Sequence, residues 1–320
     1  MTTQWQRKRI ILAELNSGEF VSGEYIAEQL GISRAAVGKQ IAALGEFGVD
    51  IGSVKGRGYK LFSPLSLVDG AALVAGCSNR CFYFDEIDST NAFMLQHSDE
   101  LQSGDICVAE YQAAGRGRRG RKWQSPYGSH LYFSMHWHFA QGMAQTMGLS
   151  LVVACSLVSV LTKFGADDIG VKWPNDIYLE GRKLAGVLIE MSGTADSGCN
   201  VVIGIGVNIA MPQAQGELID QPWSDLQQLE VMPDKTELTL ALYQKLLDDL
   251  RLFEAEGLRA FQSRWNAADI YQGQQVNLQL GDTVISGEYQ GIDEQGGVLL
   301  ATADGVKQFV GGEITLRKSV

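Results

Sequence analysis

A short glycine-arginine segment at residues 115–123, GRGRRGRKW, places five positive charges and three glycines in its first eight positions. Glycine permits backbone angles that other residues avoid and lets amide groups approach a ligand closely. Amide donors that alternate with guanidinium groups suit the wrapping of one small polyanion. We therefore predict that this loop binds a nucleotide phosphate. Basic runs also bind nucleic-acid backbones or simply lie in water, and both alternatives stay open on these residues alone.

A second candidate for chemistry is the segment KWPNDIYLEGRKLAGVLIE, residues 172–190. Its pattern is typical of a hairpin with Lys183 just inside the return strand, followed by small or apolar residues. An ammonium at the mouth of an apolar hairpin is costly to desolvate unless an anion accompanies it. Asn175 and Asp176 on the preceding strand are placed to orient this lysine or to hold a metal. Taken alone, however, the segment is better explained as a surface Lys–Asp pair of little energetic value.

The tetrapeptide DSTN, residues 88–91, follows a predicted strand and opens a predicted helix. Ser89 or Thr90 suits the N-cap position, where a side-chain oxygen accepts from a free backbone amide. Three small hydrogen-bonding residues at a helix start also suit a compact polar ligand, and the two roles can coexist.

Histidines and cysteines indicate no metal site. His136 and His138 face the same side of a strand, but no third ligand is spaced to join them, so we predict a packing role. Five cysteines without any CxxC pair favour reduced thiols in a cytosolic protein. The N-terminus lacks the apolar core of a signal peptide, and the longest apolar run, residues 149–161, is too short to span a bilayer. We expect a cytoplasmic protein with no membrane partner.

The N-terminal residues have the pattern of a DNA-binding module. Residues 4–62 predict three short helices, with Ser22 and Ser33 as N-caps, followed by a basic hairpin that resembles the wing of winged-helix proteins. Residues 1–62 hold eight Lys/Arg against six Asp/Glu, whereas the remaining 258 hold 18 against 31. Only this segment carries the net positive charge that binding to the DNA phosphates requires. A helical docking domain is the alternative. The residues predicted to contact DNA are Ser33, Arg34, Lys39, Gln40, Lys55 and Arg57.

The rest of the chain predicts an α+β fold (α/β in the broad sense). Residues 66–270 alternate between helical and strand patterns, and the two-residue turn at 180–181 indicates a mixed, mostly antiparallel sheet. The last fifty residues are short alternating strands broken by glycine turns, as in a small SH3-like β-barrel. We predict three domains: a winged helix-turn-helix at 1–64, a central ligand-binding domain at 65–270 and an SH3-like domain at 271–320. Expected strands are 81–87, 108–111, 130–139, 171–180, 182–190 and 201–209, and expected helices are 90–97, 145–164 and 236–257.

Four motifs together carry a family resemblance. DSTN at 88–91, YQAAGRGRRGRKWQSP at 111–126, KWPNDIYLEGRKLAGVLIE at 172–190 and GIGVNIA at 204–210 resemble the biotin–protein ligases. The resemblance covers the central segment and the barrel, and the combination of the glycine-arginine loop with the KWPND hairpin is specific. With the winged helix in front, the chain is similar to the bifunctional form of the family, which is biotin ligase and biotin-operon repressor in one polypeptide.

The resemblance implies a two-step reaction. Biotin's carboxylate attacks the α-phosphate of ATP, supplied with Mg²⁺, to give biotinyl-5'-AMP, which then acylates a lysine of a biotin carboxyl carrier protein. It implies catalytic roles for Lys183, Arg118 and Asp176, the last orienting Lys183 or binding Mg²⁺; no residue is assigned as a metal ligand outright. It implies ligand contacts for Ser89, Thr90, Asn91, Gln112, Gly115, Arg116, Gly117, Arg118, Arg121, Trp123, Lys183, Asn208, Trp223 and, in the barrel, Arg317.

The resemblance also implies regulation. The adenylate is expected to act as corepressor and to favour a homodimer that presents two winged helices to palindromic operator DNA. Residues 190–194 are a candidate edge for pairing between subunits. Two rival hypotheses stay open: a lipoate or octanoate ligase of similar fold, and a ligand-sensing repressor without catalysis, against which Lys183 and the complete loop argue.

Overall fold

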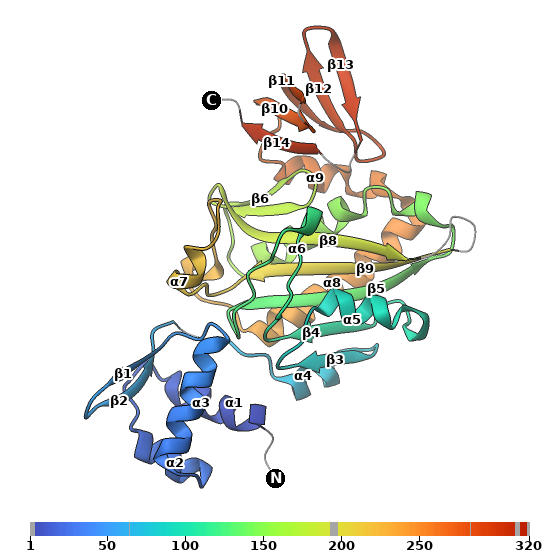
Figure 1. The fold of residues 1–320 in the computed structure, drawn as a ribbon. Helices are drawn as coiled ribbons and strands as arrows, with labels where there is room; N and C mark the ends of the chain where they lie inside the picture. Colours follow the sequence, from blue (N-terminus) through green and yellow to red (C-terminus); the bar gives the residue numbers. More distant parts are fainter. Residues whose placement is uncertain (1–3, 64, 193–197, 282, 311–313, 319–320) are drawn as a thin grey trace.

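The computed structural model describes residues 4–63, 65–192, 198–281, 283–310 and 314–318. Along the chain the protein divides into three parts (Figure 1). Three helices and a hairpin form the N-terminal part, a seven-stranded sheet with helices on both faces forms the centre, and a five-stranded sheet forms the C-terminal part. The mixed α/β architecture predicted from the sequence is confirmed.

The N-terminal part contains α1 (Gln4–Leu15), α2 (Gly23–Leu30), α3 (Arg34–Glu46), β1 (Ile51–Val54) and β2 (Gly58–Leu61). Both predicted caps are confirmed, because the Ser22 hydroxyl accepts from the amide of Tyr25 and the Ser33 hydroxyl from that of Ala36. Gly31 ends α2 at a φ of 61°, a conformation that glycine adopts without strain, and so turns the chain into α3. The wing β1–β2 is antiparallel.

The central sheet has the strand order β3-β4-β5-β9-β8-β7-β6. Only the β3–β4 pair is parallel among the pairs in this described sheet, so the predicted mostly antiparallel sheet is confirmed. The strands are β3 (Cys81–Phe84), β4 (Ile106–Ala109), β5 (His130–Phe139), β6 (Ile169–Lys172), β7 (Asp176–Leu179), β8 (Arg182–Ser192) and β9 (Cys199–Asn208).

One predicted strand was wrong. Residues 171–180 do not form one strand. Within this range β6 ends at Lys172 and β7 begins at Asp176, and the two strands pair with each other. The chain reverses at Trp173–Asn175, where the Trp173–Pro174 peptide is cis. Pro174 has no amide hydrogen for a sheet ladder, which explains why the strand is interrupted there. The predicted turn at Glu180 and Gly181 is confirmed, with positive φ angles of 51° and 72°.

Helices cover both faces of the central sheet. Met94 on α5 (Thr90–Gln96) packs with Cys107 and Val202, whereas the neighbouring strand residues face the large core shared with α6 (Leu149–Lys163) and α8 (Lys235–Glu256). The predicted helix 145–164 begins later, at Leu149. Residues 143–163 are long and apolar enough to cross a membrane, but most of α6 is buried against the sheet and serves as its core helix. The remaining helices are α4 (Gly70–Gly76), α7 (Gln213–Gly216) and α9 (Gln262–Ala268).

The C-terminal sheet is antiparallel, in the order β13-β12-β11-β10-β14. Its buried residues continue the central core, and the indole of Trp173 donates to the carbonyl of Gly296 at 2.9 Å. This bond ties the β6–β7 turn to the C-terminal part. The strands are β10 (Gln275–Leu280), β11 (Thr283–Ile292), β12 (Val298–Thr302), β13 (Gly305–Phe309) and β14 (Ile314–Lys318).

The N-terminal part packs directly on the central sheet. Trp5 of α1 stacks on Tyr127 with ring centroids 4.8 Å apart, and Arg9 of α1 pairs with Asp85 at 2.7 Å. Arg9 also donates to Glu110, which is fully buried and holds the ammonium of Lys235 at 2.6 Å. Glu110 lies just before the glycine-arginine loop, and its carbonyl accepts from Gly128 just after it. The base of the loop is therefore part of this packed interface.

Candidate functional site

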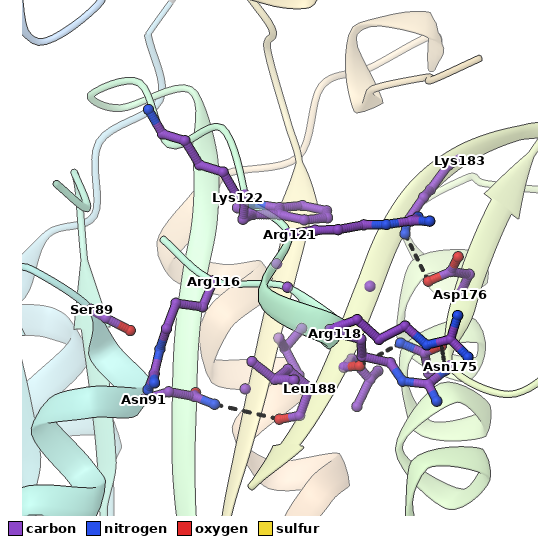
Figure 2. Close-up of a pocket in the computed structure, with 18 of the residues that line it drawn as sticks. Ser89, Asn91, Arg116, Arg118, Arg121, Lys122, Asn175, Asp176, Lys183 and Leu188 are labelled. Carbon is purple, nitrogen blue, oxygen red and sulfur yellow. Dashed lines mark hydrogen bonds and ion pairs between the residues drawn. The ribbon is translucent and has the colours of Figure 1, made fainter. Parts of the chain in front are cut away.

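One pocket opens on the α5 face of the central sheet (Figure 2). Most of its lining comes from four segments: the start of α5, the glycine-arginine loop, the β6–β7–β8 region and the middle of β9. The structure brings most of the predicted site residues together there. They are Ser89, Thr90, Asn91, Gln112, Arg116, Gly117, Arg118, Arg121, Trp123, Asp176 and Lys183.

Lys183 faces Asp176 inside this pocket, with 2.8 Å between ammonium and carboxylate (Figure 2). Their side chains are 15% and 21% exposed, so this is not the surface pair that the sequence alone favoured. A β-bulge at Leu184 makes the arrangement possible, because Tyr178 opposes Lys183 while Ile177 opposes Ala185. The extra residue lets Lys183 face the pocket while both Leu184 and Ala185 are buried in the core.

The glycine-arginine loop lies over the pocket as a small hairpin. The amide of Gly117 donates to the carbonyl of Arg121, and that of Trp123 donates to Gly115. The guanidinium of Arg118 donates to the side-chain oxygen of Asn175 at 2.9 Å, and Asn175 in turn donates to the carbonyl of Val187. Burial lowers the pKa of Arg118, opposed in part by the carboxylate of Asp176. The loop is thereby attached to the β6–β7 turn.

A set of four buried side chains and the partly buried Gln112 lies beneath the loop and is here called the polar row: Asn91, Ser134, Thr90, Gln112 and Ser125. The Ser134 hydroxyl contacts the amide oxygen of Asn91 at 2.5 Å and the hydroxyl of Thr90 at 2.8 Å. Thr90 donates to the amide oxygen of Gln112 from both its amide and its hydroxyl, and Gln112 donates to Ser125. Ser89 is the N-cap of α5, as predicted, and accepts from Ala92.

Glycines in β9 make room for these groups. A Cβ at Gly204 would lie 2.3 Å from the amide oxygen of Asn91, and one at Gly206 would lie 2.7 Å from the Trp123 ring. Any side chain at either position would displace the polar row or the indole. Trp123 thus lies flat on the sheet, and its ring centroid is 5.8 Å from the ammonium of Lys183.

The pocket wall is strongly cationic. Among the described residues that line it, seven carry positive charge and Asp176 alone carries negative charge. Cations gathered on one wall attract an anion, and the attraction of the three that are partly buried, Arg118, Lys172 and Lys183, is stronger than it would be in water. The seven are Arg116, Arg118, Arg119, Arg121, Lys122, Lys172 and Lys183. A pocket with a polar row at one end and this wall at the other suits an elongated ligand with a polar head and a phosphate-rich tail.

The comparisons with known proteins agree with this geometry. The Biotin/lipoate A/B protein ligase family model matches residues 83–208, an HTH domain model matches 7–60, and the Biotin protein ligase C terminal domain model matches 271–317. Over 310 residues, covering 97% of each chain, the protein is 46% identical to the Bifunctional ligase/repressor BirA of Salmonella typhimurium strain LT2 and 44% identical to that of Escherichia coli strain K12. The chain belongs to the family of bifunctional ligase/repressors of the BirA type.

A solved structure supports the same assignment. The biotin protein ligase from Aquifex aeolicus in complex with biotin and ATP is 28% identical, with a TM-score of 0.64. The match covers 75% of this chain and 99% of that one. The SH3-like C-terminal fold expected from the sequence agrees with the match to the family's C-terminal domain.

Three residues implied by the family resemblance, Gly115, Asn208 and Trp223, do not line the pocket as described, and the side chain of a fourth, Arg317, is not described. Gly115 lies at the base of the loop, and the side chain of Asn208 donates to the carbonyls of Lys183 and Ser224, holding the strand that carries Lys183. The indole of Trp223 donates to Gly216 in α7. Arg317 belongs to β14, but its side chain lies outside the described part of the chain.

Sequence reasoning missed several residues of the pocket. Ser134 and Glu190 come close to the site only through pairing of distant strands. Ser134 lies in none of the motifs, and Glu190 ends the segment 172–190 without having been singled out within it. Lys122 lies inside the glycine-arginine loop, so its position in that motif was the available signal. Asn175 was predicted with Asp176 to orient Lys183 or hold a metal, and it lines the pocket with its side-chain oxygen bonded to Arg118. Other lining residues that were not predicted are Arg119, Phe133, Lys172, Trp173, Pro174, Gly186, Val187, Leu188, Gly204, Ile205, Gly206 and Gln221.

The predicted DNA-contacting residues lie at two places. Ser33, Arg34, Lys39 and Gln40 belong to the cap and first turns of α3, with Arg34 paired to Glu24 at 2.7 Å. Lys55 and Arg57 lie exposed at the wing tip, where the Arg57 guanidinium lies 4.3 Å from the ring centroid of Phe20. Of the histidine pair, His136 is buried and His138 is exposed and bonded to Asn200, so the two do not share one packing environment.

Proposed function

We infer that this protein is an ATP-dependent biotin–protein ligase that also represses transcription. Its carboxylate substrate, biotin, attacks the α-phosphate of ATP, pyrophosphate leaves, and the resulting biotinyl-5'-AMP transfers biotin to a lysine of a carboxyl carrier protein. Full-length identity to ligase/repressors and the match to a ligase solved with biotin and ATP support this function. The N-terminal winged helix binds operator DNA, with the adenylate as corepressor. The protein acts in the cytoplasm, and its five free thiols support that location.

Lys183 is the central catalytic group of this proposal. Its ammonium, fixed by Asp176 at 2.8 Å, stabilises the negative charge that grows when the carboxylate attacks phosphorus. A preorganised charge of this kind lowers a barrier by about 3–4 kcal/mol. Mg²⁺ arrives with ATP as part of the substrate, and Asp176 is the carboxylate of the pocket wall that would bind it if it does not only orient Lys183. Arg118 and Arg121 bind phosphate oxygens, Arg116 and Gly117 cover the ligand, and Arg317 contacts the triphosphate.

The polar row is suited to a ligand that donates hydrogen bonds. Asn91, Ser134, Thr90 and Gln112 make three oxygen–oxygen contacts along their length, of 2.5, 2.8 and 3.1 Å. Two hydroxyl groups provide only two protons for these contacts, so the row has spare acceptor capacity. The ureido ring of biotin carries two N–H donors, whereas lipoate and octanoate have none in their ring or tail.

The polar row, rich in acceptors and next to the cationic wall, is the observation that supports biotin as the substrate. Pyrophosphate exchange tests this proposal. Labelled pyrophosphate should enter ATP in the presence of biotin, and lipoate or octanoate should support less than about 1% of that exchange, because an unsatisfied buried polar row costs several kcal/mol. Equal exchange with lipoate would assign the chain to the lipoate branch. Absence of exchange with all three, despite biotin binding, would leave a sensing repressor.

The loop is expected to close when ligand binds. Three glycines and five like charges make the free loop costly to order, and an anion offsets the repulsion. Trypsin should therefore cleave at residues 116–122 in the unliganded protein, and biotin with ATP should slow this cleavage about tenfold or more. Cleavage at the exposed wing tip, Lys55 and Arg57, serves as an internal control and should not change. Equal cleavage of the loop in both states would contradict closure.

Repression is expected to depend on the adenylate through dimerisation. The backbone of Val187 is bonded to Asn175, and beyond it the edge of β8 away from β9 has no neighbouring strand among the described residues. This supports pairing of two subunits along residues 188–192; positions 193 and 194 of the edge predicted from the sequence, 190–194, lie outside the described residues. Ordering the loop reduces the entropy still to be lost on association.

Sedimentation and operator binding should be measured for the free protein, with biotin, with ATP and with both. Biotin plus ATP should strengthen self-association and operator binding about 5- to 150-fold, the range of typical allosteric coupling. Arg57→Ala should weaken operator binding while leaving self-association unchanged, because the wing is remote from β8 (Figure 1). Identical behaviour in all four states would leave an enzyme with a DNA-binding domain but no switch.

A further inference from the structure

Glu190 links the glycine-arginine loop to the polar row. It lies on β8, and one of its carboxylate oxygens accepts both from the guanidinium of Arg116 at 3.1 Å and from the amide of Asn91 at 2.8 Å. Figure 2 shows the Arg116 side chain pointing away from the loop toward Asn91. The carboxylate thus joins a loop residue to a side chain of the pocket floor that is 4% exposed.

The other end of the polar row returns to the loop. Ser125, the last member of the row, donates its hydroxyl to the carbonyl of Trp123 at 3.0 Å. A continuous path of hydrogen bonds therefore starts at Arg116 near the beginning of the loop and ends at Trp123 near its end. The path runs from Glu190 through Asn91, Ser134, Thr90, Gln112 and Ser125.

The Glu190 carboxylate is held in place before the loop closes, so its ion pair with Arg116 stabilises the closed loop more than an ordinary surface ion pair would. Exposed pairs contribute little because two flexible side chains must be ordered for one weak attraction. Here the carboxylate is already held by Asn91, whose two amide hydrogens point to Glu190 and to the carbonyl of Leu188. Only the arginine remains to be ordered when the loop closes, so less entropy is lost.

We infer that Glu190 is a positioning residue: it anchors Arg116 and thereby holds the closed loop over the bound adenylate. The polar row in turn holds the Glu190 carboxylate in place. The inference rests on the proposed ligase function. Glu190 touches neither the reacting carboxylate nor the phosphate in this scheme. It acts through Arg116 on how long the adenylate stays in the pocket, and a ligand that orders the polar row strengthens the anchor. Its place on β8 also puts this anchor on the strand proposed to pair in the dimer.

The test is a double-mutant cycle on adenylate release. Glu190→Gln keeps an oxygen for Asn91 but removes the charge that holds Arg116, and Arg116→Gln removes the partner. Each variant should release preformed, labelled biotinyl-5'-AMP about three- to tenfold faster in a chase with unlabelled adenylate. The double variant should be no faster than the faster single variant, since both changes break the same contact. In Glu190→Gln, the rate of adenylate formation at saturating biotin and ATP should stay within about twofold of the native rate, because Glu190 does not line the pocket wall that binds the substrates.

Glu180→Gln is the matched control, because it removes a partly exposed Glu–Arg ion pair of similar length, 3.0 Å to Arg182, at the start of the same strand. It should leave release unchanged. Unchanged release in Glu190→Gln, or additive effects in the double variant, would overturn the positioning role. Failure of the native protein to make any adenylate would instead refute the ligase assignment, so the two failures are distinguishable.

Discussion

Lys183→Met is expected to lower the rate of adenylate formation about a hundredfold or more while leaving the fold intact. Methionine is close to lysine in volume and cannot carry charge, so the pocket loses its fixed ammonium but little of its shape. Loss of one preorganised transition-state donor costs about 2.7–4 kcal/mol. The 15% exposure of Lys183 adds to the effect, because water screens a partly buried charge only weakly. Single-turnover formation of biotinyl-5'-AMP measures it directly.

Lys307→Met provides the matched control for this variant. Lys307 makes a 2.7 Å pair with Asp304 in the C-terminal sheet, comparable in length with the 2.8 Å pair of Lys183, but it is exposed and remote from the pocket. Adenylate formation should be unaffected by its loss. A decrease of less than tenfold in Lys183→Met, about 1.4 kcal/mol, would be incompatible with a transition-state role.

The second large effect is expected on stability, from Lys235→Met. Lys235 and Glu110 are both 0% exposed and lie 2.6 Å apart, beside the Arg9 contact between the N-terminal and central parts. Burial lowers the pKa of Lys235, and the neighbouring Glu110 only partly opposes this. Removing the lysine leaves the buried Glu110 carboxylate without its main opposite charge. Loss of one partner from a buried ion pair typically lowers the free energy of unfolding by about 3–5 kcal/mol. This is a large share of the about 5–15 kcal/mol by which most domains are stable.

Urea unfolding of Lys235→Met should therefore show a clear loss of stability. Adding Glu110→Gln to Lys235→Met should restore part of the loss, because the unpaired charge disappears while the contacts from Tyr83 and Val68 to this side chain can persist. Lys245→Met is the control: its partner Asp249 is also held by Arg264, so the cost should stay below about 1 kcal/mol. A comparable cost for Lys235→Met would show that the Lys235–Glu110 pair contributes no more than the Lys245–Asp249 pair, in which the lysine is partly exposed and the aspartate has a second cation.

Local features of this protein were predictable because they depend on neighbours in the sequence. Ser22, Ser33 and Ser89 cap helices because each supplies an oxygen to the amide three residues ahead. The turn at 180–181 follows from a glycine that tolerates positive φ. The charge density and glycine spacing of the loop are likewise local properties. For Lys183, residue types alone favoured a surface pair with Asp176, and its proposed catalytic role came from the family resemblance.

Tertiary structure decided how these pieces combine. The bulge at Leu184 turns Lys183 into the pocket, and no property of the residues 182–186 distinguishes that register from a regular hairpin. Gly204 and Gly206 are needed only because Asn91 and Trp123, more than 80 residues away in the chain, occupy their side-chain space. Glu190 meets Asn91 across 99 positions of sequence. Such contacts depend on strand order and packing, which many distant residues determine together. The sequence by itself therefore indicated which residues belong to the candidate site, and the tertiary structure determined how they are arranged.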